Sequence, residues 1–194
     1  LIFDIGAISV DGLQGNLNFG LHYFFIFFIY FFGPLAPFFW VLLVDYKIFM
    51  DDANFRRRIK KLYIYPILIN SVLSFLSIFT GWFFVMDKNN LYLRGDLFPV
   101  HAAVFVFYYI IITFFIFKFR NRLGKKFFFS NLIVLVFPFS IGIIQGFFYK
   151  LELIWPTIAI SIMVYFFIYQ SNQLNYDYLT GLHNRRSLDE YLKV

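Results

Sequence analysis

Long apolar runs that contain no Asp, Glu, Lys or Arg are the main pattern along the chain. Four such runs cover residues 62–86, 97–117, 127–149 and 153–169, and a fifth lies within the uncharged stretch 12–44, where the apolar density rises near Phe19. The hydrocarbon core of a bilayer is about 30 Å thick, so a helix needs about 20 apolar residues to cross it. The runs are continuous and lack the alternation of barrel strands, and a helix satisfies its own backbone groups inside lipid. The pattern therefore predicts an all-α fold, a polytopic transmembrane helix bundle with about five spans.

The first ten residues form a shorter apolar segment that ends at Asp11 and Gly12. This segment is too short to span a bilayer, and it has neither the basic region nor the cleavage site of a signal peptide. We therefore expect the chain to be a piece of a longer protein in which more of a helix precedes Leu1. Proline removes a backbone donor and clashes with the preceding turn, so we expect kinks or helix ends where it occurs in or beside the spans. These positions are Pro34, Pro37, Pro66, Pro138 and Pro156.

The basic residues are concentrated in alternate loops. Most lie between spans one and two, between spans three and four, or at the C-terminus, and only Lys88, Arg94 and Lys150 lie on the opposite side. Loops rich in Lys and Arg stay in the cytoplasm under the positive-inside rule. The sequence therefore predicts a multi-pass protein of the inner (cytoplasmic) membrane with a cytoplasmic C-terminus. The residues that carry this prediction are Lys47, Arg56, Arg57, Arg58, Lys60, Lys61, Lys118, Arg120, Arg122, Lys125, Lys126, Arg185, Arg186 and Lys193.

The composition excludes a water-soluble enzyme. The chain is 61% hydrophobic and only 14% charged, whereas an ordinary soluble domain is about 25% charged. It contains no Cys and three His, which excludes thiolate metal sites and leaves little for a histidine cluster, so we expect no metal site. A net charge of +6 would favour a nucleic-acid partner in a soluble protein, but basic clusters beside a membrane report orientation and attract anionic lipid headgroups. We therefore expect the lipid bilayer as a partner and no nucleic acid.

Small and polar residues recur on one face of the second span. Asn70, Ser74, Ser77 and Gly81 follow one another at intervals of four, three and four residues, which places them on one helical face. Such a face is either a packing seam between helices or the wall of a ligand pocket. In the fourth span, Gln145 lies inside a G-x-x-x-G pattern that favours helix packing. His22 and His101 lie near the outer ends of other spans, where a histidine is either an interfacial residue or a proton sensor. The positions open to a sensing or a packing role are Asn70, Ser74, His101 and Gln145.

The character of the sequence changes after Tyr169. Residues 170–176 are polar and contain no Pro or Gly, which predicts a short helical linker rather than a free tether. Residues 177–186 then read Asp-Tyr-Leu-Thr-Gly-Leu-His-Asn-Arg-Arg, in which Thr180-Gly181 predicts a turn and Asn184 a helix N-cap. The pattern predicts a membrane bundle over residues 1–169, a linker over 170–176 and the beginning of a cytoplasmic domain over 177–194.

The same ten residues resemble the entry motif of GGDEF domains, the catalytic domains of diguanylate cyclases. The family pattern is D-x-L-T-G-L-x-N-R-R, and the resemblance covers only residues 177–194. It implies that these residues begin an α/β domain. The preceding region resembles, more loosely, the multi-helix membrane sensors attached to such cyclases. The fixed positions of the pattern are matched by Asp177, Leu179, Thr180, Gly181, Leu182, Asn184, Arg185 and Arg186.

The resemblance also implies a chemistry for the full-length parent protein. Members of the family join two GTP molecules into cyclic di-GMP with loss of two pyrophosphates, and each domain of a homodimer holds one GTP. The resemblance thus implies a bacterial signalling enzyme that uses Mg²⁺ or Mn²⁺. The family's metal-binding carboxylates and guanine-reading residues have no counterpart within residues 1–194, and the matched residues form a structural turn. We therefore expect this stretch to be catalytically incomplete and name no catalytic residue in it.

Two other interpretations remain open at this point. In the first, the GGDEF domain of the parent is degenerate and acts as a membrane-bound nucleotide receptor or a partner-docking module. In the second, the chain is a structural or transport bundle in which the motif is accidental. An intact Gly-Gly-(Asp or Glu)-Glu-Phe sequence beyond Val194, with the upstream metal-binding Asp, would favour the enzyme.

Overall fold

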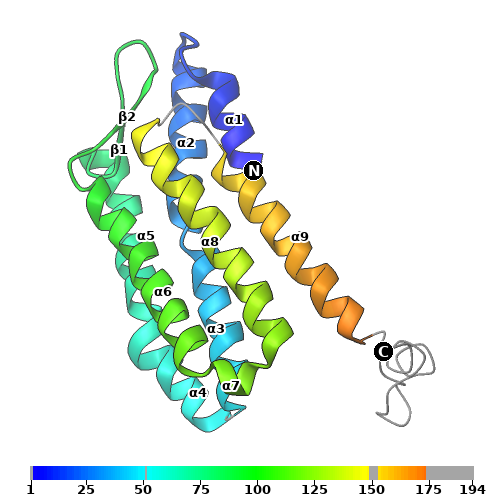
Figure 1. The fold of residues 1–194 in the computed structure, drawn as a ribbon. Coiled ribbons are helices and arrows are strands. Elements are labelled where there is room, and N and C mark those ends of the chain that lie inside the picture. Colours follow the sequence, from blue (N-terminus) through cyan, green and yellow to red (C-terminus); the bar gives the residue numbers. More distant parts are fainter. Residues whose placement is uncertain (1, 51, 149–152, 174–194) are drawn as a thin grey trace. The chain divides into compact units, whose positions relative to one another are not determined.

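The computed structural model describes residues 2–50, 52–148 and 153–173. Most of these residues are helical, and the predicted helical character is confirmed for them (Figure 1). Two short strands, which the all-α prediction does not include, accompany the helices. The chain divides into two compact units, one over Leu1–Phe119 and one from Arg120 onward.

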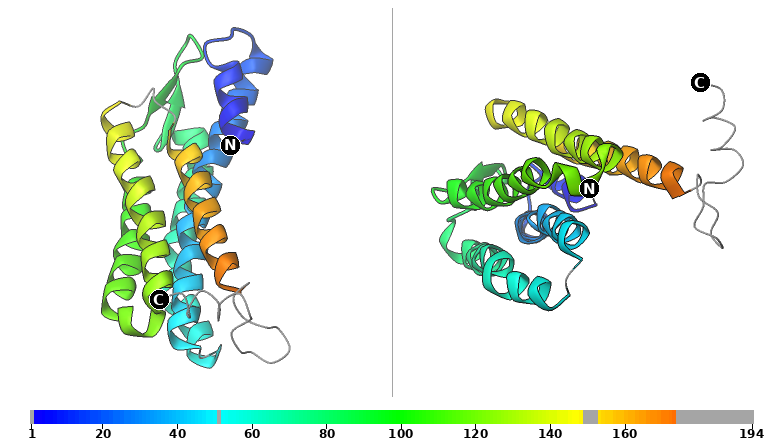
Figure 2. Two further views of the ribbon diagram at one scale, coloured as in Figure 1. Left: turned by 45° about the vertical axis from the view of Figure 1, so that its right-hand side comes forward. Right: turned by 60° about the horizontal axis from the view of Figure 1, so that its bottom comes forward.

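The first unit pairs helices from distant parts of the chain. α1 packs against α2, α2 against α5, α3 against α6, and α5 against α6. A β-hairpin lies at one end of this unit and α4 at the other (Figure 2). Its elements are α1 (Ile2–Val10), α2 (Asn16–Phe32), α3 (Leu35–Phe49), α4 (Asp52–Arg58), the π-helical turn η1 (Ile59–Tyr63), α5 (Ile64–Thr80), β1 (Phe84–Met86), β2 (Tyr92–Arg94) and α6 (Phe98–Lys118).

Four helical stretches in the described part of the chain are long and apolar enough to cross a membrane. They are Asn16–Phe49, Asn54–Thr80, Phe98–Lys118 and Phe127–Gln145, and they correspond to four of the five predicted spans. The fifth prediction, 153–169, contains an apolar helical stretch of intermediate length, Ile154–Ile168. These helices are compatible with a membrane-embedded protein.

α5 is polar on its buried face and apolar on its exposed face. Asn70, Ser74 and Ser77 are buried, whereas Phe79 is 75% exposed. A helix in a water-soluble protein shows the opposite distribution, and a large exposed apolar surface marks contact with lipid or another protein. The distribution therefore supports a lipid environment for α5. The exposed apolar side chains along α5 are Tyr65, Leu68, Ile69, Val72, Phe75 and Phe79.

The predicted second span, 62–86, extends too far at its C-terminal end. α5 ends at Thr80, and Gly81 takes the left-handed conformation with φ 68° while its N–H bonds to Ser77 O. A helix commonly ends in this way because glycine has no Cβ to clash there. The following apolar residues instead form β1, which pairs antiparallel with β2 and sets Val85 opposite Leu93. The hairpin packs with α1 and α2 in one core cluster made of Ala7, Ile26, Tyr30, Phe83, Phe84 and Met86.

The prolines occupy different structural positions. Pro34 separates α2 from α3, as expected for a helix end. Pro37 and Pro156 lie in the first turns of α3 and α9, where the missing N–H has no intrahelical partner to lose. Pro138 lies inside α8. Pro66 lies in the first turn of α5, three residues after the π-helical turn η1 ends at Tyr63. The residue four before it, Leu62, belongs to η1, and a wider turn moves the carbonyl oxygen with which the proline ring would otherwise clash.

The second unit contains a helical hairpin. α8 packs along α9 (Figure 1), and α9 extends to Gln173, beyond the predicted end of the bundle at 169. A Cβ on Gly142 would lie 3.6 Å from Cδ1 of Ile154, an ordinary van der Waals distance, so the packing against α9 does not require a glycine there. The elements of this unit are α7 (Arg120–Leu123), α8 (Lys125–Phe147) and α9 (Ile154–Gln173).

Candidate functional site

Among the described residues of the first unit, buried polar side chains and their more exposed partners form three clusters. A buried polar group without a hydrogen-bond partner costs free energy, so such groups are found in networks. We name the clusters by one member each. The His101 cluster contains Tyr30, Asn70, Ser74 and His101; the His22 cluster contains Asp11, His22 and Asn90; and the Asp45 cluster contains Asp45, Arg58, Tyr63 and Tyr108.

Asn70 is the centre of the His101 cluster. Its Oδ1 lies 2.7 Å from Nδ1 of His101, and because an amide oxygen can only accept, Nδ1 of the imidazole is the donor. Its Nδ2 donates to the backbone oxygen of Tyr30 at 2.9 Å and to Oγ of Ser74 at 3.4 Å. One side chain from α5 therefore joins α2 and α6.

Aromatic rings surround the imidazole of His101. The ring centroids of Tyr30, Phe105 and Phe83 lie 4.5, 5.1 and 5.5 Å from its own. The hydroxyl of Tyr30 is 2.5 Å from that of Tyr92 on β2, which extends the network from the helices to the hairpin. Burial raises the pKa of the Tyr92 hydroxyl above its usual value, so this group stays protonated and available as a donor at neutral pH.

The hydrogen bonds of the His101 cluster join helices to one another. Both the donor and the acceptor ends of the Asn70 amide are used within the chain, so a ligand at this position would have to replace bonds that hold α2, α5 and α6 together. Ser77 supports the same seam, since its Oγ accepts the backbone N–H of Phe83 at 3.0 Å. The geometry favours the packing interpretation of Asn70, Ser74 and His101, and a sensing role for them stays a prediction.

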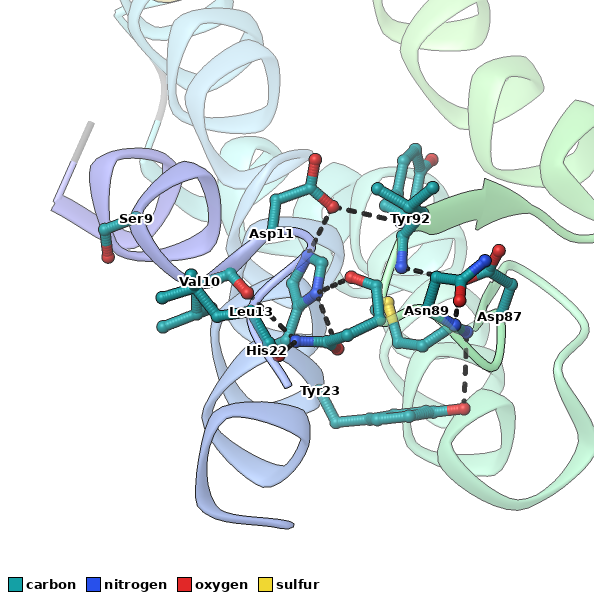
Figure 3. Close-up of polar contacts among 12 residues, drawn as sticks. Ser9, Val10, Asp11, Leu13, His22, Tyr23, Asp87, Asn89 and Tyr92 are labelled. Atoms are coloured by element: carbon teal, nitrogen blue, oxygen red, sulfur yellow. Dashed lines mark hydrogen bonds and ion pairs between the residues drawn. The ribbon is translucent and has the colours of Figure 1, made fainter. Parts of the chain in front are cut away.

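The His22 cluster joins the α1–α2 connection to the β-hairpin (Figure 3). Nδ1 of His22 lies 3.1 Å from both the backbone oxygen and Oδ1 of Asn90. The Asn90 amide in turn donates to the backbone oxygens of Val10 and Leu13, each at 2.9 Å. Oδ1 of Asp11 accepts the backbone N–H of Tyr92 at 3.3 Å and lies 3.9 Å from Nε2 of His22. His22, only 1% exposed, is thus a buried connector rather than an interfacial side chain.

The turn of the hairpin has a defined local structure. Oδ1 of Asp87 accepts the backbone N–H groups of Asn89 and Leu91, both at 2.8 Å, which is the way an aspartate closes a tight turn. Asn90 has φ 59°, a left-handed conformation that asparagine tolerates better than most residues. A Cβ on Gly95 would lie 2.1 Å from the Gly81 oxygen. Close backbone packing therefore requires a glycine at position 95.

The Asp45 cluster is a buried ion pair near the end of α3. Asp45 is fully buried, and Arg58 donates Nε to Oδ2 at 2.7 Å and Nη2 to Oδ1 at 2.6 Å. The Tyr63 hydroxyl also donates to Oδ2, and the Tyr63 backbone oxygen accepts from the Tyr108 hydroxyl at 2.6 Å. The guanidinium carbon of Arg58 lies 4.5 Å from the ring centroid of Phe49. The paired charges and their additional donors together offset the cost of burying the carboxylate.

The π-helical turn places both donors on one side of the helix. Arg58 and Tyr63 are five residues apart, so in an α-helix, at about 100° per residue, they would point about 140° away from each other. In a π-helix the hydrogen bond runs from residue i to i+5, so residues five apart lie roughly above one another. The backbone N–H of Ile64 makes such a bond to the oxygen of Ile59. The irregular turn thereby brings both side chains to Asp45.

Sequence reasoning identified only part of these clusters. It placed Asn70 and Ser74 on one helical face and named His101 separately, and the structure brings the three together. Gln145 lies in the other unit, where its Oε1 accepts the backbone N–H of Ile154 at 3.1 Å and caps α9. Sequence reasoning missed Asp45 and Asn90. Asp45, a single acid at the end of a long uncharged run beside a basic loop, is the signal that could have indicated a buried pair.

The residues of the GGDEF-like motif, 177–186, lie outside the described residues. Within the described residues no group of three or more His, Asp or Glu side chains is placed to hold a metal ion. The chain matches no family model, no curated protein and no solved structure. Interpretation of its function therefore depends on its own residues and on the geometry above.

Proposed function

We propose that this chain is the membrane anchor and sensor part of a diguanylate cyclase that makes cyclic di-GMP from two GTP molecules in bacterial signalling. One observation carries the proposal: the ungapped match of Asp177–Arg186 to the D-x-L-T-G-L-x-N-R-R pattern at eight fixed positions. The four apolar helical stretches that are long enough to span a membrane support the anchoring role. We place the motif on the cytoplasmic side of the membrane because the basic loops are concentrated on that side.

The arrangement of α9 supports a regulatory connection. α9 extends to Gln173, and only three residues lie between it and Asp177. A helix transmits rotation and translation along its axis, whereas a flexible linker does not. In such a parent the membrane part would act by changing how two cyclase domains meet, since each holds one of the two GTP molecules.

In this proposal the chemistry belongs to residues of the complete protein beyond this chain. The family's Mg²⁺ or Mn²⁺ ligands have no counterpart in the sequence of residues 1–194. No catalytic residue or reaction step is therefore assigned to this chain. The contribution proposed for its residues is anchoring, dimer contact and control.

The proposal is tested by extending the reading frame past Val194 and assaying the complete protein in membranes. We expect a Gly-Gly-(Asp or Glu)-Glu-Phe sequence and formation of cyclic di-GMP from GTP that stops when EDTA removes the divalent ion. Residues 1–194 alone should form no product and serve as the matched control. A complete protein that binds GTP or cyclic di-GMP without synthesis would instead be a receptor, and a reading frame without a GGDEF domain would contradict the proposal.

A further inference from the structure

An open hollow of about 420 Å³ lies at the start of the long helix that leads into α5. Arg56, Arg57, Lys60 and Lys61 line it, and all of these side chains are exposed. The four side chains come from a segment that includes the π-helical turn η1, across which residues five apart, such as Arg56 and Lys61, lie roughly above one another. The hollow is therefore surrounded by four neighbouring positive charges.

The cations of this segment have two different roles. Arg58 turns inward and binds Asp45 at 2.6 and 2.7 Å, whereas the four other cations line the hollow. Like charges close together on a helix repel one another and destabilise it. An anion bound there would relieve this repulsion.

The length of the helix places the hollow at the level of lipid headgroups. Asn54–Thr80 contains 27 residues, about 40 Å at 1.5 Å per residue, whereas the hydrocarbon core of a bilayer is about 30 Å thick. The exposed apolar side chains begin at Leu62, directly after Lys61, and continue to Phe79. When Leu62–Phe79 lies in hydrocarbon, the hollow therefore lies in the adjacent headgroup layer.

We propose that this hollow binds the phosphate headgroup of an anionic phospholipid. Arginine binds phosphate oxygens through its planar fork and lysine through its point charge, and the hollow is open on the side from which a headgroup would enter. A lipid fits better than free phosphate because Leu62 and Tyr65, 46% and 55% exposed, offer apolar surface to its acyl chains within about one turn of the hollow. The inference requires a membrane around α5, and it does not depend on the cyclase domain.

The site is tested with the purified chain in detergent, titrated with phosphatidylglycerol and with phosphatidylcholine of the same acyl chains, and read by native mass spectrometry. The test variant is Arg57→Gln/Lys60→Gln/Lys61→Gln. The control variant is Arg120→Gln/Arg122→Gln/Lys125→Gln, which removes the same charge from exposed positions of the other basic loop. Arg57, Lys60 and Lys61 supply three of the four charges around the hollow, so we expect the test variant to lose at least about tenfold in phosphatidylglycerol binding.

The control variant should lose less than about twofold, and phosphatidylcholine should bind all three proteins weakly. Unchanged phosphatidylglycerol binding by the test variant, or equal loss in both variants, would overturn the assignment. Full displacement of the lipid by millimolar sodium phosphate would show a free-phosphate site and would also overturn it.

A second measurement needs no substitution. Phosphatidylglycerol with a photoreactive acyl chain should crosslink the unaltered protein between residues 60 and 69, and crosslinks found only elsewhere would contradict the site.

Discussion

The guanidinium group of Arg58 binds both carboxylate oxygens of Asp45, a residue that is fully buried at the end of α3. The pair connects α3 to the start of the long helix that contains α5, and the π-helical turn adds the Tyr63 hydroxyl to the same carboxylate. A buried charge that loses its partner is strongly destabilising, whereas removal of both partners costs less. This difference gives the pair a clear experimental signature.

Arg58→Gln should lower the free energy of unfolding by about 3 kcal/mol, at the low end for a buried pair because the Arg58 side chain is 28% exposed. The double variant Asp45→Asn/Arg58→Gln should be more stable than Arg58→Gln alone, because it leaves no unpaired carboxylate. Arg57→Gln, at the neighbouring exposed position, is the control and should change stability little. Thermal unfolding in detergent measures all of them, and additive losses in the double variant would show that the pair is not coupled.

Asn70→Leu should destabilise the first unit, because the imidazole N–H of His101 and the Tyr30 carbonyl oxygen both lose their partner. We expect about 1 kcal/mol, since hydrogen bonds between membrane helices are worth roughly that amount. The double variant Asn70→Leu/His101→Phe should lose less free energy of unfolding than the sum of the losses in the two single variants. A strictly additive result in the double-mutant cycle would mean that the 2.7 Å contact contributes nothing.

Gly95→Ala should disrupt the end of the hairpin, because the new Cβ would lie 2.1 Å from the Gly81 oxygen and 2.4 Å from the Trp82 oxygen. Both atoms belong to the backbone and cannot rotate away, so a loss of about 2 kcal/mol or more is expected. Gly20→Ala is a matched control, since nothing lies within 4 Å of a Cβ built there and alanine favours a helix. Equal unfolding temperatures for the two variants would contradict the close approach.

The sequence predicted the helices well and the hairpin poorly. The spans could be predicted because the length of a charge-free apolar run is read directly along the sequence and needs no knowledge of contacts between distant residues. Phe84, Val85 and Met86 continue the apolar run of α5 without a polar break, so only Gly81, a frequent helix terminator, distinguished strand from helix. The pairing of Asp45 with Arg58, or of His22 with Asn90, depends on contacts between distant segments and on an irregular helical turn. Periodicity alone does not contain this information.

The orientation of the bundle is tested by single cysteines, which is straightforward because the chain contains no native Cys. Asn89→Cys, in the hairpin turn, should react with a membrane-impermeant thiol reagent in intact cells. Asn54→Cys, at the start of the basic segment, should react only after the cells are opened. Asn89 lies outside the apolar helical stretches, and Asn54 is the first residue of Asn54–Thr80, ahead of the exposed apolar side chains that begin at Leu62. Labelling of Asn54→Cys in intact cells would reverse the predicted topology.

The central proposal is that the membrane bundle controls a cyclase domain through the helical direction set by α9. Insertion of one to four alanines after Asn172 in the complete protein rotates the downstream cyclase domain by about 100° per residue, so cyclic di-GMP formation should rise and fall with insert length. Seven alanines should nearly restore the original output, because two turns of a packed seam take about seven residues. A steady decline with length, an output that ignores the insertions, or no cyclic di-GMP from any of these proteins would contradict the claim.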